Sequence, residues 1–304
     1  MKQYIISNKQ KYDPTKLLLV GGKAMGLWKF PKLNTPSWFV LTTEFFNEIY
    51  GSDQELINTF VAKGDEKALE QLIMLKEFPK KFEKMILKNV DSKKTYVIRS
   101  SGVDEDNFDA SFAGMMSSYL SVNVDSIFTF IKKTYLSAFS KRALNYRHMN
   151  NLSTMNIKMA VIVQEMIDAD ISGVLFTINP VTNNPDEFLI SVVKGLGESL
   201  VSGEENSVDY VVNAGNIEGN NPLLTKKEIL KITELGYLIL RDSHTFQDIE
   251  FCLKDGILYF LQTRTIVPYK NIDIKEPRTI YDNSNIIESY SGTTSMLTFT
   301  FARF

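Results

Sequence analysis

The chain has 304 residues, 44% of them hydrophobic and 23% charged, which is the balance of a folded globular protein and excludes a disordered chain. Its 34 Lys and Arg against 36 Asp and Glu give a formal net charge of −2, which argues against a dedicated nucleic-acid or membrane-surface binder. The single cysteine, Cys252, excludes an intramolecular disulfide and favours a reducing, cytoplasmic compartment. No apolar run approaches the roughly 18 to 20 residues of a membrane helix, and the two histidines lack partners at metal-ligand spacing.

The first half of the chain is predicted to mix short strands with longer helices. Residues 17–20 are apolar and predict a short buried strand, which Gly21-Gly22 separates from a helix over residues 23–30. The further elements expected in this half are a strand at 38–41, helices within 43–90, a strand at 95–99 that enters a turn at 100–102, and helices within 124–149.

The second half is predicted to be richer in strands. The expected elements are strands at 157–165, 174–178, 188–193 and 208–212, a helix over 226–241, and a hairpin of strands 247–253 and 257–263. Together the elements predict an α+β fold of two lobes around a cleft, with a boundary between residues 90 and 160.

The last part of the chain loses this periodicity. From about Asn271 no regular element is expected, and the sequence stops at Phe304 inside the apolar run TFTFARF. We therefore expect an N-terminal lobe at 1–110, a C-terminal lobe at 111–268, and a linker at 269–304 that leads towards a further domain.

The predicted hairpin carries charged and amide side chains at alternate positions. Asp248 and Glu250 share one face of their strand. A two-residue Asp-Gly loop would oppose Glu250 with Leu261 and put Gln262 on the other face, whereas a three-residue Lys-Asp-Gly loop would oppose Asp248 with Gln262. The second register gathers Asp248, Glu250, Gln262 and Arg264 on one surface, where their oxygens and guanidinium suit Mg²⁺ and a polyphosphate. The alternative is a solvated strand face with a surface ion pair.

Three other clusters have both a ligand-binding and a structural interpretation. Arg99 places a cation at a strand end before Ser-Ser-Gly, where either a binding site or an exposed turn is expected. Gly114 lies in the small SFAG segment, whose amides either close over phosphates or form a β-turn around one buried aromatic. Lys23 follows two glycines at a helix start, where anions are favoured, although the spacing of a P-loop is absent.

Five stretches occur in a fixed order between about Val20 and Ile266. They are VGGKAMGLWKF, YVIRSSGVDEDNFDASFAGMMSSYLSV, MAVIVQEMIDADISGVLFTINPVT, VVKGLGESLVSG and QDIEFCLKDGILYFLQTRTI. In this order they resemble the N-terminal ATP-binding domain of the phosphoenolpyruvate-utilising dikinases, a family that includes phosphoenolpyruvate synthase, pyruvate phosphate dikinase and rifampin phosphotransferase. The combination of RSS…ED…SFAG with DIE…LQ-x-R makes the resemblance specific.

The resemblance implies an ATP-grasp-like fold whose two α+β lobes enclose a nucleotide. It implies that Lys23 contacts the ATP phosphates, that Arg99 binds and polarises the transferring group, and that Arg264 stabilises phosphate charge. The other implied contacts are Gln164 near the adenine, Gly114 and Ser118 in the loop over the phosphates, and Glu250 and Gln262 on Mg²⁺ with Asp248 close by.

The resemblance also implies partner domains. In such enzymes ATP phosphorylates a histidine on a separate swivelling domain, which then delivers the phosphoryl group to a substrate such as pyruvate on another domain. Neither His148 nor His244 lies in the expected Gly-Gly…Ser-His segment, so both the phosphohistidine domain and the pyruvate-binding or phosphoenolpyruvate-binding domain are expected in trans or lost by truncation. This chain alone is not expected to complete the overall reaction.

Three departures from the family pattern remove no candidate ligand: Met115 replaces a glutamine, Phe251 a tryptophan and Thr265 a proline. The final NIIESYSGTTSMLTF favours a phosphoenolpyruvate-synthase-like (pyruvate, water dikinase) enzyme. The ATP-binding domain of an antibiotic phosphotransferase and a non-catalytic nucleotide-binding module are the alternatives.

Overall fold

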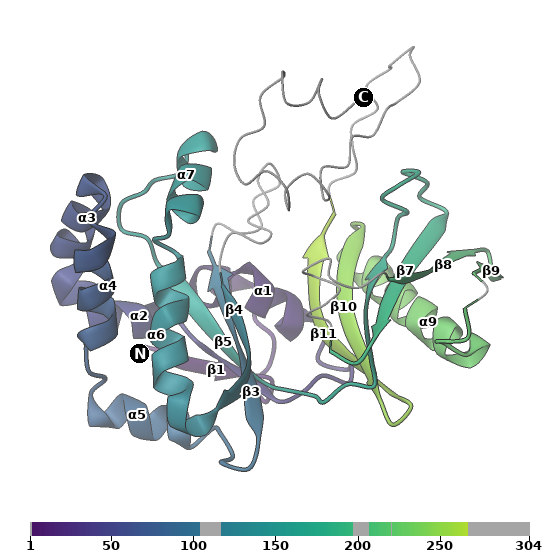
Figure 1. Ribbon diagram of the computed structural model, residues 1–304, viewed down its shortest axis with the longest axis horizontal. Helices are drawn as coiled ribbons and strands as arrows, with labels where there is room; N and C mark the ends of the chain where they lie inside the picture. Colours follow the sequence, from purple (N-terminus) through teal and green to yellow (C-terminus); the bar gives the residue numbers. More distant parts are fainter. Residues whose placement is uncertain (1, 104–116, 197–206, 220, 267–304) are drawn as a thin grey trace, which may run out of the picture.

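The computed structural model describes residues 2–103, 117–196, 207–219 and 221–266, which form two lobes, each built on an antiparallel sheet (Figure 1). None of the helices in these ranges is long and apolar enough to cross a membrane.

The first lobe contains a five-stranded sheet in the order β1-β2-β5-β3-β4. Its strands are β1 Ile5–Ser7, β2 Trp38–Leu41, β3 Thr95–Gly102, β4 Ser118–Asn123 and β5 Met159–Glu165. Successive side chains point to opposite faces of a strand, so Val40 and Ile162 join one hydrophobic core while Phe39 and Val161 join another. The sheet is therefore buried on both faces.

Helices cover one face of this sheet, as Figure 1 shows. They are α2 Thr43–Tyr50, α3 Gln54–Lys63, α4 Glu66–Leu75, α5 Lys80–Leu87, α6 Ile127–Ser137 and α7 Lys141–Met149. Helix α2 begins where the hydroxyl of Thr42 accepts the Phe45 amide, a common N-cap contact. Aromatic rings of Phe45, Phe46, Phe82 and Tyr135 are buried and pack the helices together.

Helix α1, Leu17–Lys29, lies between the two lobes and contacts β3, β5 and β11. The strand predicted at residues 17–20 is wrong, because these residues form the first turn of α1 and the side chains of Leu17 and Leu18 are 40% and 69% exposed. A short apolar run does not distinguish strand from helix by periodicity. Gly21 then interrupts the helical path with φ 74° and ψ 168°, and the helix resumes at Gly22.

The second lobe contains a six-stranded sheet in the order β11-β10-β6-β7-β8-β9, with α9 packed on it. The elements are β6 Ile171–Phe176, β7 Glu187–Lys194, β8 Val208–Asn213, β9 Asn216–Glu218, α9 Lys226–Ser243, β10 Gln247–Lys254 and β11 Ile257–Thr265. Edge strand β11 faces the first lobe, where the backbone of Asn34 accepts the amide of Phe260 and its side chain donates to the Leu258 carbonyl. Phe260 and α1 belong to the same core, so the lobes share packed side chains.

The α+β class and the two lobes are confirmed, as are the helices and the remaining strands to within a few residues. One further prediction is wrong: residues 100–102 continue β3 instead of forming a turn, because Ser100 and Ser101 pair with β5 and are fully buried. The change from one sheet to the other falls between Glu165 and Ile171. The division after residue 110 stays a prediction of domain organisation, and residues 269–304 lie outside the described ranges.

Candidate functional site

The β10–β11 hairpin has a β-bulge that decides which side chains meet. Its turn is the two-residue Asp255-Gly256 loop, with φ values of 50° and 71° that favour this pair. The pairing begins at the turn with Lys254 opposite Ile257 and shifts beyond Phe251, leaving Leu261 as the extra residue.

The register of the two-residue loop holds from the turn to Phe251, but neither register considered for the hairpin holds at Glu250 and Asp248. The bulge sets Glu250 opposite Gln262 and Asp248 opposite Arg264, whereas the three-residue loop would have set Asp248 opposite Gln262. Phe260 remains in the core on one side of the ribbon while Gln262 turns to the side of Glu250. One extra residue reverses the face of everything that follows it in the strand.

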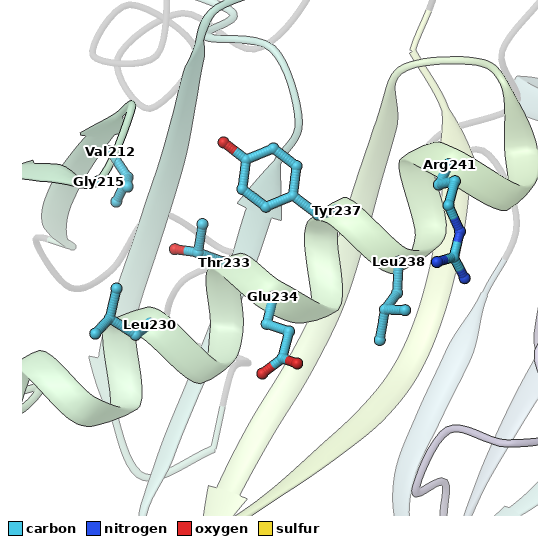
Figure 2. Close-up of a pocket in the computed structure, with 8 residues that line it drawn as sticks. All are labelled: Val212, Gly215, Leu230, Thr233, Glu234, Tyr237, Leu238 and Arg241. Carbon is cyan, nitrogen blue, oxygen red and sulfur yellow. The ribbon is translucent and has the colours of Figure 1, made fainter.

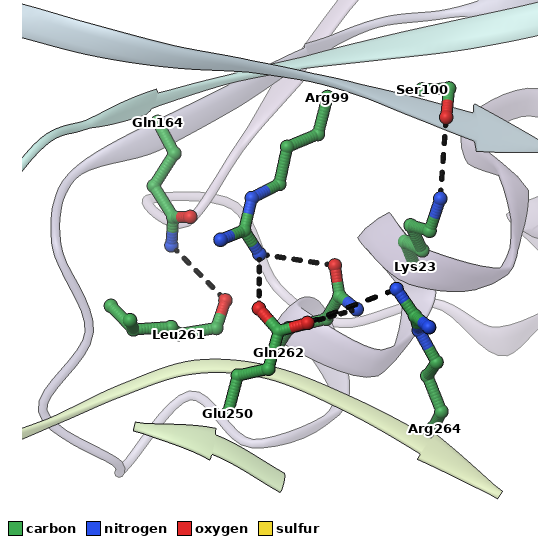
Figure 3. Close-up of polar contacts among 8 residues, drawn as sticks. All are labelled: Lys23, Arg99, Ser100, Gln164, Glu250, Leu261, Gln262 and Arg264. Carbon is green, nitrogen blue, oxygen red and sulfur yellow. Dashed lines mark hydrogen bonds and ion pairs between the residues drawn. The ribbon is translucent and has the colours of Figure 1, made fainter. Parts of the chain in front are cut away.

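Arg99 reaches from β3 of the first sheet to this hairpin of the second (Figure 3). Its Nη1 donates to Glu250 Oε2 at 3.0 Å and to Gln262 Oε1 at 3.1 Å. Gln262 Nε2 donates to Glu250 Oε1 at 3.2 Å, and Arg264 Nη2 lies 3.8 Å from the same oxygen. A single guanidinium nitrogen thus meets one carboxylate and one amide oxygen across the lobe interface.

Lys23 supplies a second cation from α1. Its side chain is 8% exposed, and its Nζ donates to the Ser100 hydroxyl at 3.2 Å. The adjacent Ser101 hydroxyl accepts the Ala24 amide at 3.1 Å. Gly21 lies so close to this strand that a Cβ on it would be 2.2 Å from the Ser101 carbonyl oxygen. The glycine kink therefore lets α1 approach β3 and brings Lys23 beside Arg99.

The charges around Glu250 act on its carboxyl in opposite directions. Burial raises its pKa, but Arg99, Arg264 and Lys23 together outweigh burial and hold the pKa below its usual value. Asp248 differs: burial and then repulsion from Glu250 raise its pKa to about 6, and Arg264 only partly opposes them. Glu250 is therefore the ionised carboxylate at neutral pH, and Asp248 is the more easily protonated one.

The remaining predicted site residues occupy different positions. Gln164 on β5 is 1% exposed, and its Nε2 donates to the carbonyl of the bulge residue Leu261 at 3.4 Å. Ser118 is the β4 partner of Arg99 in the first sheet and is exposed. Gly114 lies outside the described residues. The structure thus brings Lys23, Arg99, Gln164, Asp248, Glu250, Gln262 and Arg264 around one junction of α1, β3, β5 and the hairpin.

Ser100 and Ser101 are positioning residues that the sequence-based interpretation assigned to a turn. Their hydroxyls anchor α1 through Lys23 and the Ala24 amide. The signal for this role was present in the sequence, since the two serines directly extend a strand that contains the apolar run Tyr96 to Ile98.

The donor set at this junction fits Mg²⁺, which favours oxygen ligands and takes only one or two protein carboxylates. Glu250 and Gln262 offer a carboxylate and an amide oxygen, and Asp248 lies two residues along the same strand. Among the described residues, Asp248 Oδ1, Arg99 Nε and Arg264 Nε are buried without a hydrogen-bond partner. Because buried polar atoms are normally paired, these three favour an anionic ligand and a cation at this place.

A separate hollow of about 510 Å³ lies beside α9, between this helix and the β8–β9 turn (Figure 2). Leu230, Tyr237 and Leu238 give it a largely apolar lining, and its charged members are Glu234 and Arg241. It lacks the pairing of carboxylate and amide oxygens and the cluster of cations that the junction contains, so the binding of an anionic ligand with its cation is assigned to the junction.

Comparison with known proteins points to the same chemistry. The family model described as pyruvate phosphate dikinase, AMP/ATP-binding domain, matches residues 17–220. Rifampicin phosphotransferase of Bacillus cereus is 30% identical to this chain over 304 aligned positions, which cover 84% of the chain and 35% of that protein. Phosphoenolpyruvate synthase of Pyrococcus furiosus is 34% identical over 168 positions, which cover 55% of the chain and 21% of that protein.

These alignments span about a third or less of the relatives' own length. Among solved structures, D-alanine–D-alanine ligase of Helicobacter pylori aligns with 63% of the chain and 48% of the ligase at 8% identity and a TM-score of 0.35, a likeness too low to carry an argument.

Proposed function

The chain belongs to the family of the pyruvate phosphate dikinase AMP/ATP-binding domain, and from this premise we propose that it binds Mg-ATP at the lobe junction and donates a phosphoryl group from it. The observation that carries the proposal is the meeting of Arg99 with Glu250 and Gln262 across two sheets. An ATP-grasp-like arrangement, with the nucleotide between the lobes, is part of the proposal.

The proposed chemistry is phosphoryl transfer by positioning and electrostatic stabilisation. Lys23 and Arg264 bind phosphate oxygens, and Arg99 stabilises the negative charge that develops on the group being transferred. Glu250 and Gln262 hold Mg²⁺, with Asp248 as a further oxygen donor beside them. When bound, the metal ion neutralises phosphate charge and fixes the orientation of the phosphates. Gln164 is proposed to lie near the adenine. Ser118 and Gly114 are proposed to belong to the loop that covers the phosphates.

We propose a histidine on a separate swivelling domain as the first acceptor, with a further domain binding pyruvate or phosphoenolpyruvate. The relatives are much longer than the aligned segment, which leaves room for such domains in them. The test supplies a histidine domain from a related phosphoenolpyruvate synthase in trans with ATP that is labelled in both its β- and γ-phosphates. Acid-labile label on that domain is expected; ATP binding without any transfer would support a non-catalytic nucleotide-binding module instead.

An antibiotic as final acceptor is the second candidate. Rifampicin phosphotransferase of Bacillus cereus aligns with 84% of this chain, against 55% for the phosphoenolpyruvate synthase of Pyrococcus furiosus. Both candidates share the ATP site proposed here and differ in the domains that receive the phosphoryl group. The labelled histidine domain is incubated with pyruvate or with a rifamycin, each in the presence of the matching acceptor domain. The compound that receives the label separates the two candidates.

A further inference from the structure

The arrangement of Arg99 has a consequence for how a metal ion enters the site. We propose that Arg99 is a specificity-determining residue, which makes the site accept a divalent cation as its polyphosphate complex in preference to the free ion. The inference rests on the proposed function and names the form in which the cation is recognised.

Arg99 Nη1 occupies the place that a cation would take. It lies 3.0 Å from Glu250 Oε2 and 3.1 Å from Gln262 Oε1, and it donates a hydrogen bond to each (Figure 3). A Mg²⁺ ion bound to both oxygens must lie roughly 2.1 Å from each of them. Guanidinium nitrogen and metal ion cannot share that space, so the metal ion enters only when Arg99 leaves.

The other carboxylate oxygen provides no free alternative. Glu250 Oε1 accepts the Gln262 amide at 3.2 Å and has Arg264 Nη2 at 3.8 Å. The Glu250 side chain is 27% exposed and that of Arg99 is 12% exposed, so water screens the pair only in part. A free divalent cation must therefore break a partly buried ion pair to bind.

The charge of the junction opposes the free ion further. Three cations, Lys23, Arg99 and Arg264, surround the Glu250 carboxylate, and Arg264 also acts on the carboxylate of Asp248. Adding a bare divalent cation increases a local positive excess, whereas a metal–triphosphate complex arrives with net negative charge. Its phosphate oxygens also receive the displaced guanidinium, whose planar fork matches them. The phosphate oxygens thus accept the hydrogen bonds that Arg99 no longer donates to Glu250 and Gln262.

A purely structural role for Arg99 makes the opposite prediction. If the ion pair only fastened the lobes together, its removal would loosen the junction, and affinity for a free cation would stay unchanged or fall. The specificity role predicts that affinity for the free cation rises, because the position is vacated and one positive charge is removed.

The test measures Mn²⁺ binding to the 304-residue chain by electron paramagnetic resonance and calorimetry, with and without ATP. Without nucleotide, Arg99→Gln is expected to bind Mn²⁺ about tenfold or more tightly than the unmodified chain. Arg99→Met vacates the same place with an apolar side chain, and it must show the same gain. Glu250→Gln in the Arg99→Gln background is expected to abolish the gain, which locates the ion at Glu250.

Two matched controls separate position from charge. Lys254→Gln removes one positive charge from the turn end of β10, the strand of Glu250, where Lys254 pairs with Asp170 at 2.9 Å. It is expected to leave Mn²⁺ affinity unchanged. Arg264→Gln removes a charge that lies beside Glu250 without holding the ligand position, so its gain should be smaller than that of Arg99→Gln. An equal gain in Mn²⁺ affinity from Arg99→Gln, Lys254→Gln and Arg264→Gln overturns the proposal.

The ATP arm distinguishes this inference from the proposed function. If the unmodified chain binds Mn-ATP but neither Arg99 variant gains affinity for free Mn²⁺, the specificity role is wrong and the nucleotide site stands. If the unmodified chain binds no Mn-ATP, the proposed function fails, whatever the variants do. Circular dichroism and thermal unfolding establish that each variant is folded.

Discussion

Arg99 and Glu250 lie on different sheets, and each provides the charged partner of the other. The guanidinium pairs with a carboxylate whose side chain is 27% exposed, and the carboxylate pairs with a cation whose side chain is 12% exposed. Arg99 lies on the face of β3 that looks towards the second lobe, because its β5 partner, Ile162, belongs to the core shared with that lobe. The pair therefore marks the point where the two lobes can act on one ligand.

We expect Arg99→Ala and Glu250→Ala each to lower phosphoryl transfer to a histidine domain in trans by about 100-fold or more, since each removes a charged group proposed to act on the phosphates or the metal ion. Transfer of label from ATP labelled in its β- and γ-phosphates measures the effect. Lys254→Ala, on the same hairpin but outside the junction, serves as the control and should retain transfer. Full activity in either of the first two variants would contradict the site assignment.

Gly21 is required at its position for two separate reasons. Its φ of 74° lies in the left-handed region, and a Cβ would be 2.2 Å from the Ser101 carbonyl oxygen. Gly21→Ala is therefore expected to lower the free energy of unfolding by about 2 kcal/mol or more, as measured by denaturant titration.

Gly64 provides the matched control for this prediction. It has a similar φ of 68°, but no atom lies within 4 Å of the place that a Cβ would take, so Gly64→Ala carries only the backbone cost of about 1 kcal/mol. Equal destabilisation by the two alanines would show that the close approach to Ser101 has no energetic weight.

At the scale of elements, the β10–β11 ribbon shows how one residue redirects a strand. Up to Phe251 the hairpin follows the register set by its two-residue turn, and beyond it the extra residue Leu261 moves Gln262 and Arg264 to the side of Glu250 and Asp248. The bulge carbonyl accepts the Gln164 amide from the first sheet. The bulge therefore belongs to the junction between the lobes as well as to the hairpin.

Helix α9 supports the second sheet and begins with a capping box. The Thr225 hydroxyl accepts the Glu228 amide while the Glu228 carboxylate accepts the Thr225 amide and hydroxyl. These hydrogen bonds hold the pKa of Glu228 below its usual value of 4.5. The stabilisation is therefore fully present above pH 4.5 and is lost as the pH falls through the lowered pKa of the folded protein.

Glu228→Gln is expected to destabilise the protein by about 0.5 kcal/mol at pH 7, because solvent at this surface position screens the charge. The difference between the two proteins should shrink as the pH falls below 4.5 and disappear once the pH is below the lowered pKa of Glu228 in the folded protein, as measured by urea titration at each pH. Glu234→Gln, further along the same helix, is the control for general effects of charge. A difference that stayed constant with pH would exclude the carboxylate as its source.

At the scale of the whole molecule, the two lobes are joined by packing and by the polar junction. Helix α1 contributes to both: Val20, Ala24 and Leu27 enter the shared core, and Lys23 enters the junction. A ligand held between cations of the first lobe and oxygens of the second would stabilise both lobes together.

Mg-ATP is therefore expected to raise the thermal unfolding midpoint of the 304-residue chain. At a nucleotide concentration of about 100 times Kd the folded state gains about 2.7 kcal/mol, which corresponds to a rise of roughly 5 °C for a chain of this size. Differential scanning calorimetry measures the shift, with a non-hydrolysable ATP analogue to prevent turnover. Glu250→Ala should abolish most of the shift, and a shift unchanged by this variant would place the nucleotide elsewhere.

The sequence by itself determined the features that depend on neighbouring residues. Helical periodicity predicted α2 to α6 and α9, apolar runs predicted most strands, and Asp255-Gly256 predicted the hairpin. The ordered motifs between Val20 and Ile266 indicated the family of the chain independently of its fold.

The tertiary structure alone decided what depends on contacts between distant segments. The apolar run at residues 17–20 became helix because Gly21 and α1 pack against β3, and Ser100 and Ser101 stayed in the strand because α1 uses their hydroxyls. The bulge at Leu261 fixed the register that two alternative loops had left open. Local periodicity cannot determine these features, because packing against residues far away in the chain sets register, helix kinks and the facing of side chains.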